Sequence, residues 1–321
     1  MNIEKIPITI ITGFLGAGKT TLINKIIEKE TDKKFAIIEN EFSDLPIDGA
    51  LISGISNNQI FELANGCICC TLDSELQETL LQLVKMDLDF NHLLIETTGI
   101  AEPDAIIQNI IVNDELKELF FIDSVCCLID TINFKANMNE KESIKQLSAA
   151  DTVIINKTET ASDEILKNIS NEIKKHNSIC EIINTKFCDY NNSNIIDKQV
   201  FNESDFNKIF NKLQTGAHKH NHSSEIKNLS FSLKESFDMD KFSLWMDYFL
   251  HINQNSIIRV KGVLYFEGIS RKIIFQSVKS AYTITEGNFW QANEEKLNKI
   301  IFIGRNLDKE NIKEGIHSLI I

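Results

Sequence analysis

A glycine-rich loop between an apolar strand and a helix constrains the fold of this 321-residue chain more than any other feature. The pattern Gly13-x-x-x-x-Gly18-Lys19-Thr20 is that of a phosphate-binding loop (P-loop), and it follows the apolar run Ile8–Ile11. In such a loop, backbone N–H groups and the following helix N-terminus face phosphates. Lys19 would reach the β and γ oxygens of a nucleotide, and the Thr20 hydroxyl would bind Mg²⁺. The alternative, a glycine-rich turn with a chance lysine, is disfavoured by this context.

A second strand ends in a carboxylate that suits the same site. The apolar run Leu93–Ile95 leads into Glu96, and Gly99 follows three residues later. We expect Glu96 to hold the magnesium through a water and the Gly99 N–H to sense the γ-phosphate, as switch segments of GTPases do. The alternative is that Glu96 is an ordinary solvated residue at a strand end.

A third segment indicates which base is bound. Asn156-Lys157-Thr158-Glu159 follows the strand-like run Val153–Ile155 and is similar to the guanine-reading NKxD motif. Glu159 keeps the carboxylate that accepts from guanine N–H groups but is one methylene longer than Asp. We therefore favour GTP over ATP.

Three thiols lie close together in Cys67-Ile68-Cys69-Cys70. Thiolates bind Zn²⁺ and other soft ions, and three ligands leave one position open on a tetrahedral ion, which suits a site that releases its metal. Carboxylates after the second strand could complete the shell in one nucleotide state; the candidates are Glu39, Glu41 and Asp44. A fixed zinc knot or buried thiols are the alternatives.

Apolar runs alternate with helical patterns through the first two-thirds of the chain, which is typical of a mainly parallel sheet covered by helices. The strand-like runs are Ile8–Ile11, Phe35–Ile38, Leu93–Ile95, Val125–Ile129, Val153–Ile155 and Glu181–Ile183. Helices are expected near Lys19–Lys29, Ser74–Met86, Asp104–Ile111, Glu140–Ala149 and Ala161–Lys175. The sequence thus predicts an α/β fold, with a P-loop NTPase domain over residues 1–213.

The pattern changes after this domain. Residues 214–226 are small and polar and are predicted to be a linker. Residues 227–321 predict a smaller α+β domain with a largely antiparallel sheet. In the linker, His218, His220 and His222 could collect zinc, nickel or cobalt weakly, but drift in a solvated loop explains them equally well.

Composition excludes several classes of protein. The formal net charge of -13 argues against nucleic-acid and anionic-membrane partners. No apolar run is long enough to cross a membrane and the start lacks a secretory signal, so we expect a cytoplasmic protein with free thiols. Cys126 and Cys127 lie in an apolar run and are expected in the core. The isolated histidines receive no role; they are His92, His176, His251 and His317.

Together these motifs resemble the CobW-like GTPase metallochaperones, which belong to the P-loop class that includes the nickel-insertion GTPases. The resemblance covers nearly the whole chain and rests on five ordered motifs: Thr12–Thr21, Glu39–Phe42, Gly66–Cys70, Glu96–Pro103 and Asn156–Glu159. Within the first motif, it implies that Gly16, Ala17 and Thr21 are among the nucleotide-binding positions. Ser43 replaces a family glycine in the switch segment, and Glu159 replaces the final Asp of the guanine motif. The resemblance implies a C-terminal domain of the CobW type over 227–321.

The resulting hypothesis is a GTP-hydrolysing metallochaperone that delivers zinc to a client protein, with slow turnover when a partner or the metal is absent. Cobalt, iron and nickel stay open as metals, because cells override intrinsic affinity by supply. One alternative is a metal buffer or sensor that nucleotide tunes without productive catalysis. Another is a maturation factor for one metalloenzyme or for corrinoid synthesis, and a homodimer is one assembly compatible with the sequence.

Overall fold

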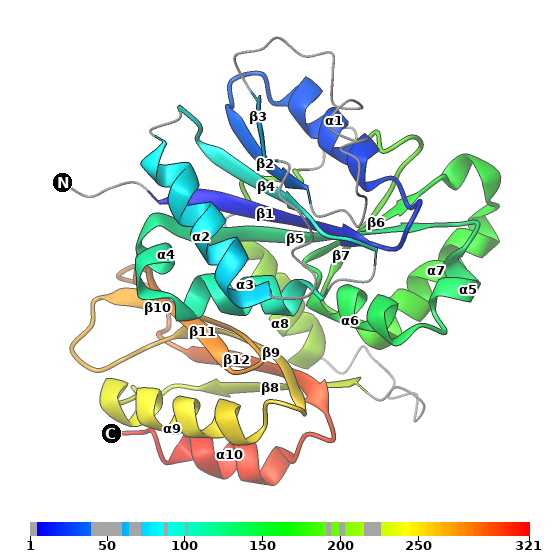
Figure 1. The fold of residues 1–321 in the computed structure, drawn as a ribbon. Coiled ribbons are helices and arrows are strands. Elements are labelled where there is room, and N and C mark those ends of the chain that lie inside the picture. Colours follow the sequence, from blue (N-terminus) through cyan, green and yellow to red (C-terminus); the bar gives the residue numbers. More distant parts are fainter. Residues whose placement is uncertain are drawn as a thin grey trace. The chain divides into compact units, whose positions relative to one another are not determined.

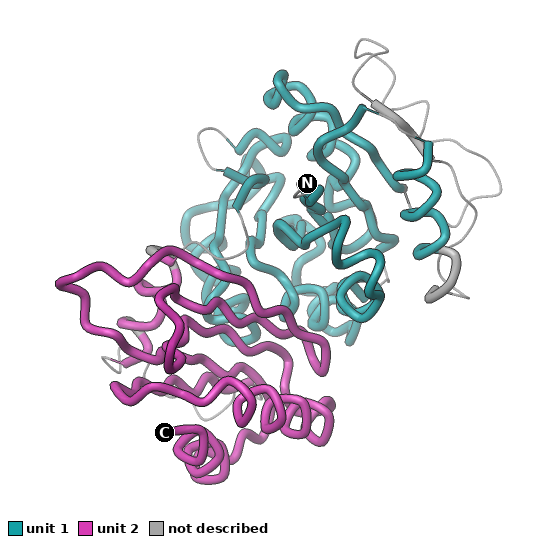
Figure 2. Tube along the Cα trace, turned by 90° about the vertical axis from the view of Figure 1, so that its left-hand side faces the viewer, with its two compact units in different colours: residues 1–200 teal, residues 201–321 magenta. Residues whose placement is uncertain are grey.

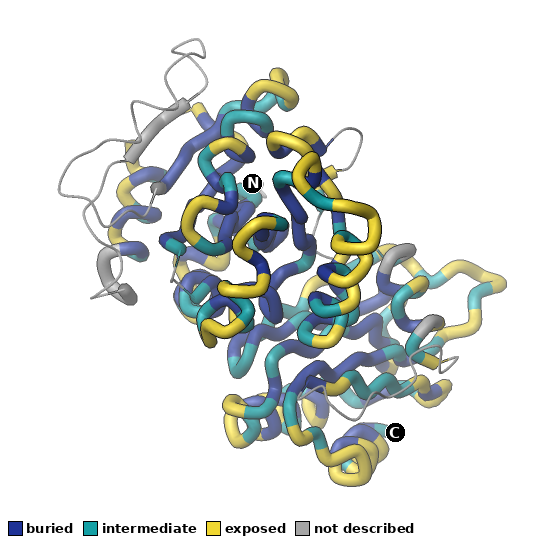
Figure 3. Tube along the Cα trace, turned by 90° about the vertical axis from the view of Figure 1, so that its right-hand side faces the viewer, coloured by how far each residue is buried: buried dark blue, intermediate teal, exposed yellow. Residues whose placement is uncertain are grey.

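The computed structural model describes residues 5–39, 60–63, 72–86, 89–99, 102–190, 194–198, 203–214 and 226–321. The chain divides into two compact units, residues 1–200 and residues 201–321 (Figure 2). Each unit has its own sheet, and buried residues follow the strands of both (Figure 3). Among the described residues, no helix is both long enough and apolar enough to span a membrane.

The first unit is built on a seven-stranded parallel sheet in the order β3-β2-β4-β1-β5-β6-β7 (Figure 1). Its strands are β1 (Ile6–Gly13), β2 (Phe35–Glu39), β3 (Ile60–Leu63), β4 (His92–Glu96), β5 (Phe120–Asp130), β6 (Thr152–Asn156) and β7 (Glu181–Asn184). The predicted α/β fold with a parallel sheet is confirmed. β3 was not among the predicted strands.

Helices cover both faces of this sheet, so the strands are buried on both sides and read as nearly continuous apolar runs. The helices are α1 (Lys19–Lys29), α2 (Leu72–Lys85), α3 (Pro103–Val112), α4 (Asp114–Leu119), α5 (Phe134–Asn137), α6 (Lys141–Ala149) and α7 (Asp163–His176). Successive strand residues point to opposite faces. Cys126 accordingly packs into the core beside α1, and Cys127 packs into the core beside α6 and α7.

The strand order positions the site. β1 lies between β4 and β5 in the middle of the sheet, and the chain leaves it in one direction to form β2 and later in the other to form β5. In open parallel sheets, ligands bind at the carboxyl ends of strands where this reversal occurs. The residues that end these strands are Gly13, Glu96, Asp130 and Asn156.

The second unit has a five-stranded antiparallel sheet in the order β11-β10-β9-β12-β8, as predicted. Its elements are α8 (Glu203–Gln214), β8 (Ile226–Leu233), α9 (Met239–Ile252), β9 (Ile257–Leu264), β10 (Arg271–Val278), β11 (Ala281–Phe289), β12 (Asn298–Arg305) and α10 (Lys309–His317). Its core gathers aromatic rings, among them Phe242, Phe266, Phe275 and Phe302. α8 falls in this unit and was not predicted.

Candidate functional site

The P-loop turns sharply at the end of β1. Gly13 has a φ of 135°, in the region that favours glycine, and a Cβ there would lie 2.2 Å from the carbonyl oxygen of Leu128 on β5. Gly18, with a φ of 109°, is the residue before α1 and makes no side-chain cap. The first turn of α1 therefore begins with backbone N–H groups directed toward the loop, which is the arrangement that binds phosphate.

Three of the predicted residues converge at the start of α1. Lys19 is only 7% exposed, and its ammonium lies 3.5 Å from the carbonyl oxygen of Phe14. The Thr20 hydroxyl lies 3.3 Å from one carboxylate oxygen of Glu96, at the end of β4. Glu96 is 6% exposed, so it is not a solvated strand-end residue. A cation, a hydroxyl and a carboxylate thus gather beside the loop.

Asn156 supports the P-loop from the end of β6. Its side-chain amide donates to the carbonyl of Ala17 at 3.0 Å. Its side-chain oxygen accepts from the Thr185 hydroxyl at 3.2 Å and from the Cys188 N–H at 3.0 Å. This buried amide therefore fastens the P-loop to the segment that follows β7.

Lys157 adds a second fastening. Its backbone is left-handed with a φ of 58°, and its ammonium donates to the carbonyl of Gly16 at 2.8 Å. The same ammonium lies 3.6 Å from Asp130, a fully buried carboxylate at the end of β5. Glu159 lies on the short 3₁₀ segment Thr158–Thr160 and is exposed to solvent.

The segment after β7 was missed by sequence analysis. Phe187 and Cys188 both have positive φ, at 52° and 58°, and the Cys188 thiol lies 3.3 Å from the carbonyl of Gly18. Burial raises the pKa of Cys188 to about 12, so the group remains a thiol. No local motif marks these residues, whereas Asp130 could have been found as a carboxylate directly after an apolar strand.

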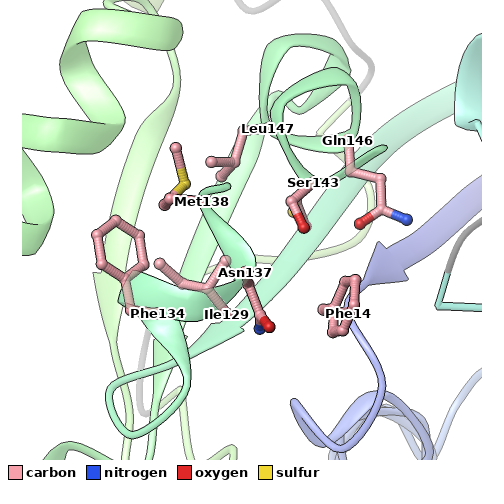
Figure 4. A pocket seen from close by; sticks show the side chains of 9 residues that line it. Phe14, Ile129, Phe134, Asn137, Met138, Ser143, Gln146 and Leu147 are labelled. Carbon is pink, nitrogen blue, oxygen red and sulfur yellow. The ribbon is translucent and has the colours of Figure 1, made fainter. Parts of the chain in front are cut away.

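A further contact joins α6 to the segment that follows β4. The Gln146 amide donates to the carbonyl of Gly99 at 3.0 Å. Gln146, Ser143 and Leu147 of α6 also line a small pocket with Phe14 of the P-loop (Figure 4). Gln146 was likewise not singled out from the sequence.

Most of the predicted transition-metal ligands lie outside the described residues: Cys67, Cys69, Cys70, Glu41, His218, His220 and His222. Glu39 ends β2 and pairs in register with Glu96, but its side chain is outside the description. Among the described residues, no group of three or more His, Cys, Asp and Glu side chains could hold a metal ion.

The described cysteines are structural. Cys126 and Cys127 are 0% and 1% exposed, which confirms their predicted place in the core. Burial raises the pKa of Cys126 to about 12 and that of Cys180 to about 11. Neutral thiols are weak metal ligands, so these buried cysteines are poor candidates for a soft-metal site.

Comparison with known proteins matches both parts of the chain to family models. Residues 7–184 match the CobW/HypB/UreG nucleotide-binding domain, and residues 226–320 match the cobalamin synthesis protein cobW C-terminal domain. The zinc chaperone YjiA of Escherichia coli K12 is 30% identical over 98% of this chain and 98% of its own length. The zinc-regulated GTPase metalloprotein activator 1 of Schizosaccharomyces pombe is 28% identical over 96% of this chain and 84% of its own.

A solved structure has the same fold. The crystal structure of the Zn(II)-bound YjiA GTPase from E. coli superposes with a TM-score of 0.66 at 23% sequence identity. The alignment covers 98% of this chain and 99% of that one.

Proposed function

The chain belongs to the CobW/HypB/UreG family and is a GTPase, and we propose that it uses GTP hydrolysis to deliver zinc from Cys67, Cys69 and Cys70 to a client protein. The observation that carries the proposal is the convergence of Lys19, Thr20 and Glu96 beside the P-loop. The names of two relatives, a zinc chaperone and a zinc-regulated GTPase activator, support zinc as the cargo.

Lys19 stabilises the charge that develops on the phosphates during hydrolysis. Thr20 and Glu96 would hold Mg²⁺. Their hydroxyl and carboxylate are the hard oxygen donors that this ion prefers, and the 3.3 Å between their oxygens lets both face one small cation, so the residues fit. The ion neutralises phosphate charge when it is bound. The chain's own residues orient the triphosphate and the loop around it.

Guanine recognition would fall to the residues behind the loop. Asn156 and Lys157 fix the P-loop carbonyls and hold the loop against β6, and Glu159 offers a carboxylate in solvent next to them. Asp130 pairs with the Lys157 ammonium and so restricts its direction. A base bound on this side would therefore meet Asn156 and Lys157, which these contacts hold, and the exposed Glu159, which has one more methylene than Asp.

In this proposal the three thiols form an incomplete zinc shell that Glu39 or Glu41 completes in one nucleotide state. Zinc is then the cargo of the cycle. Since the backbone of Glu39 pairs with that of Glu96, the switch segment begins one strand away from the magnesium carboxylate. Loss of the γ-phosphate would therefore be transmitted from Glu96 to the zinc ligands through the neighbouring strand β2. The histidines of the linker, His218, His220 and His222, would serve as auxiliary zinc ligands.

The test is zinc affinity in defined nucleotide states. Protein purified anaerobically is loaded with one equivalent of zinc, and a chromophoric chelator competes for it in GDP and in a non-hydrolysable GTP analogue. We expect at least a tenfold difference in zinc Kd between the two states. The triple variant Cys67→Ser, Cys69→Ser, Cys70→Ser should lose this zinc, and the buried-thiol control Cys126→Ala should keep it.

Equal zinc affinity in both states would contradict nucleotide-driven release. A difference in affinity without any GTP hydrolysis during transfer to an apo acceptor would instead identify a nucleotide-tuned buffer.

A further inference from the structure

Gln146 is a buried amide that faces the segment after β4. The residue is 1% exposed, and its Nε2 donates to the carbonyl of Gly99 at 3.0 Å. The ammonium of the preceding residue, Lys145, pairs with the carboxylate of Glu102. Two consecutive residues of α6 therefore hold the two ends of the segment 99–102.

Gly99 lies close to the P-loop residue Leu15. A Cβ on Gly99 would lie 2.8 Å from the backbone nitrogen of Leu15 and 3.3 Å from its Cα, so the Gly99 backbone is packed directly against the P-loop. The amide of Gln146 also donates to the Gly99 carbonyl. Gly99 is thus restrained both by its close approach to the P-loop and by a hydrogen bond from α6.

The same helix also contacts the P-loop itself. Phe14 lines a small pocket together with Ser143 and Gln146 of α6, and Asn137 and Met138 also line it (Figure 4). α6 therefore shares one pocket with Phe14 of the P-loop and donates to the segment after β4 through Gln146.

We propose that Gln146 is a positioning residue that makes the site selective for the triphosphate. Its amide donates to the Gly99 carbonyl and so restrains Gly99, the residue whose N–H we expect to sense the γ-phosphate. The inference rests on the role proposed for Gly99. Because a diphosphate lacks the group that Gly99 would bind, loss of the amide lowers affinity for the triphosphate and spares affinity for GDP.

The experiment uses the full chain without zinc and measures Kd by calorimetry for GDP and for a non-hydrolysable GTP analogue. Gln146→Met keeps the side-chain length and removes the donor. One hydrogen bond accounts for roughly a tenfold change in Kd, so we expect the analogue to bind roughly tenfold more weakly and GDP to bind within about twofold of wild type. An unchanged analogue Kd, or equal weakening of both nucleotides, would overturn the inference.

A second variant separates donation from packing. Gln146→Glu keeps the shape of the side chain and replaces the donating amide by a carboxylate, which cannot donate to the Gly99 carbonyl. The triphosphate analogue should therefore bind more weakly than in wild type while GDP affinity is spared, and an analogue affinity equal to wild type counts against the inference. Ser143→Ala is the matched control, since its hydroxyl lines the same pocket without a hydrogen-bond partner among the described residues.

The wild type distinguishes this inference from the proposed function. If the γ-phosphate adds nothing to binding in the wild type, the role of Gly99 fails and the inference fails with it. If wild type prefers the triphosphate and Gln146→Met does too, the inference alone fails. Neither result depends on zinc, so the delivery hypothesis is tested separately.

Discussion

The two ends of the seven-stranded sheet both carry polar clusters, and the clusters are bonded differently. At the carboxyl end, Asn156 and Lys157 donate to main-chain carbonyls of the P-loop. Toward the amino end, Thr9, His92 and Asp123 are all 0% exposed and bond to one another through side chains. One cluster shapes a loop that can receive a ligand, and the other fills the interior.

Hydrogen-bond directions at the amino end fix the state of His92. The Thr9 hydroxyl donates to Asp123 at 3.2 Å, so it accepts from His92 Nε2, 2.9 Å away. The remaining ring nitrogen has no hydrogen-bond partner among the residues that the structure describes, and it lies 3.8 Å from Asp197. Asp123 reaches this cluster because the pairing of β1 and β5 shifts register at this position, which redirects the side chain.

The effect of a substitution should depend on the end of the sheet at which it lies. Changes at the carboxyl end should alter nucleotide chemistry through the loop, and changes at the amino end should alter stability and leave chemistry intact. Four predictions test this division, in order of decreasing effect.

Lys19→Ala should have the largest effect. The buried ammonium is expected to stabilise phosphate charge, and removing such a group lowers the rate by a hundredfold to a thousandfold, about 3 to 4 kcal/mol of barrier. The measurement is steady-state GTP hydrolysis with a melting temperature for each protein. Lys25→Ala is the control, because Lys25 is a partly exposed residue of α1 whose ammonium pairs with Glu28. A Lys19→Ala rate equal to wild type would sink the assignment of this site.

Gly13→Ala should cost about 3 kcal/mol of folding stability, because its Cβ would meet a backbone carbonyl at 2.2 Å and its φ of 135° disfavours other residues. Gly16→Ala is the matched comparison, since Gly16 has a φ of 76° with open space around it, and it should cost about 1 kcal/mol. Urea unfolding measures both. Equal costs would mean that backbone strain, not the close approach to β5, sets the requirement for glycine. Gly13→Ala lies at the carboxyl end of the sheet and is nevertheless expected to lower stability strongly. It is therefore an exception to the rule that changes at this end act on nucleotide chemistry.

We expect His92 to make the folding stability decrease as pH is lowered. Burial lowers its pKa to about 4 from 6.5, and the Lys33 ammonium acts in the same direction, whereas the Asp197 carboxylate opposes the shift. Between these values the unfolded chain binds a proton that the folded chain does not, so stability is lost as pH falls from 6.5 toward 4. The contribution lost between pH 7 and pH 5 is about 2 kcal/mol.

The check compares urea unfolding of wild type and His92→Gln at pH 7 and pH 5. The variant should lose less stability on acidification, by about 2 kcal/mol. GTP hydrolysis at pH 7 should be similar in both proteins once they are folded. Parallel pH dependence in the two proteins would show that His92 stays neutral in the unfolded chain or charges readily in the folded one.

The sequence predicted the parallel sheet well because buried parallel strands are continuous apolar runs, as in Val125–Ile129. It missed β3, since Ile60–Leu63 is only four residues long and a run of that length does not distinguish strand from helix. It also missed α8, whose inward-facing Phe206 and Phe210 lie four residues apart in an otherwise polar segment.

The site was partly predictable for a related reason. Lys19, Thr20 and Glu96 belong to short sequence patterns that indicate a phosphate-binding site, and the structure brings the three residues together. Thr185, Cys188 and Gln146 act through long-range contacts with Asn156 and Gly99, and no local pattern marks them. Such contacts depend on the folded topology, so a single sequence gives no sign of them.

Ser124→Ala should have the smallest effect of the four and is the cleanest test of the amino end. The buried Ser124 hydroxyl donates to the carbonyl of Ile195 at 3.0 Å and so ties the segment 194–198 to β5. Loss of this bond should cost about 1 kcal/mol, with GTP hydrolysis unchanged. Ser148→Ala is the control, because that hydroxyl bonds back to Ile144 within α6, a contact that adds little to stability. If Ser124→Ala alters hydrolysis while Ser148→Ala does not, the two ends of the sheet are coupled, and the division between chemistry and stability is wrong at this point.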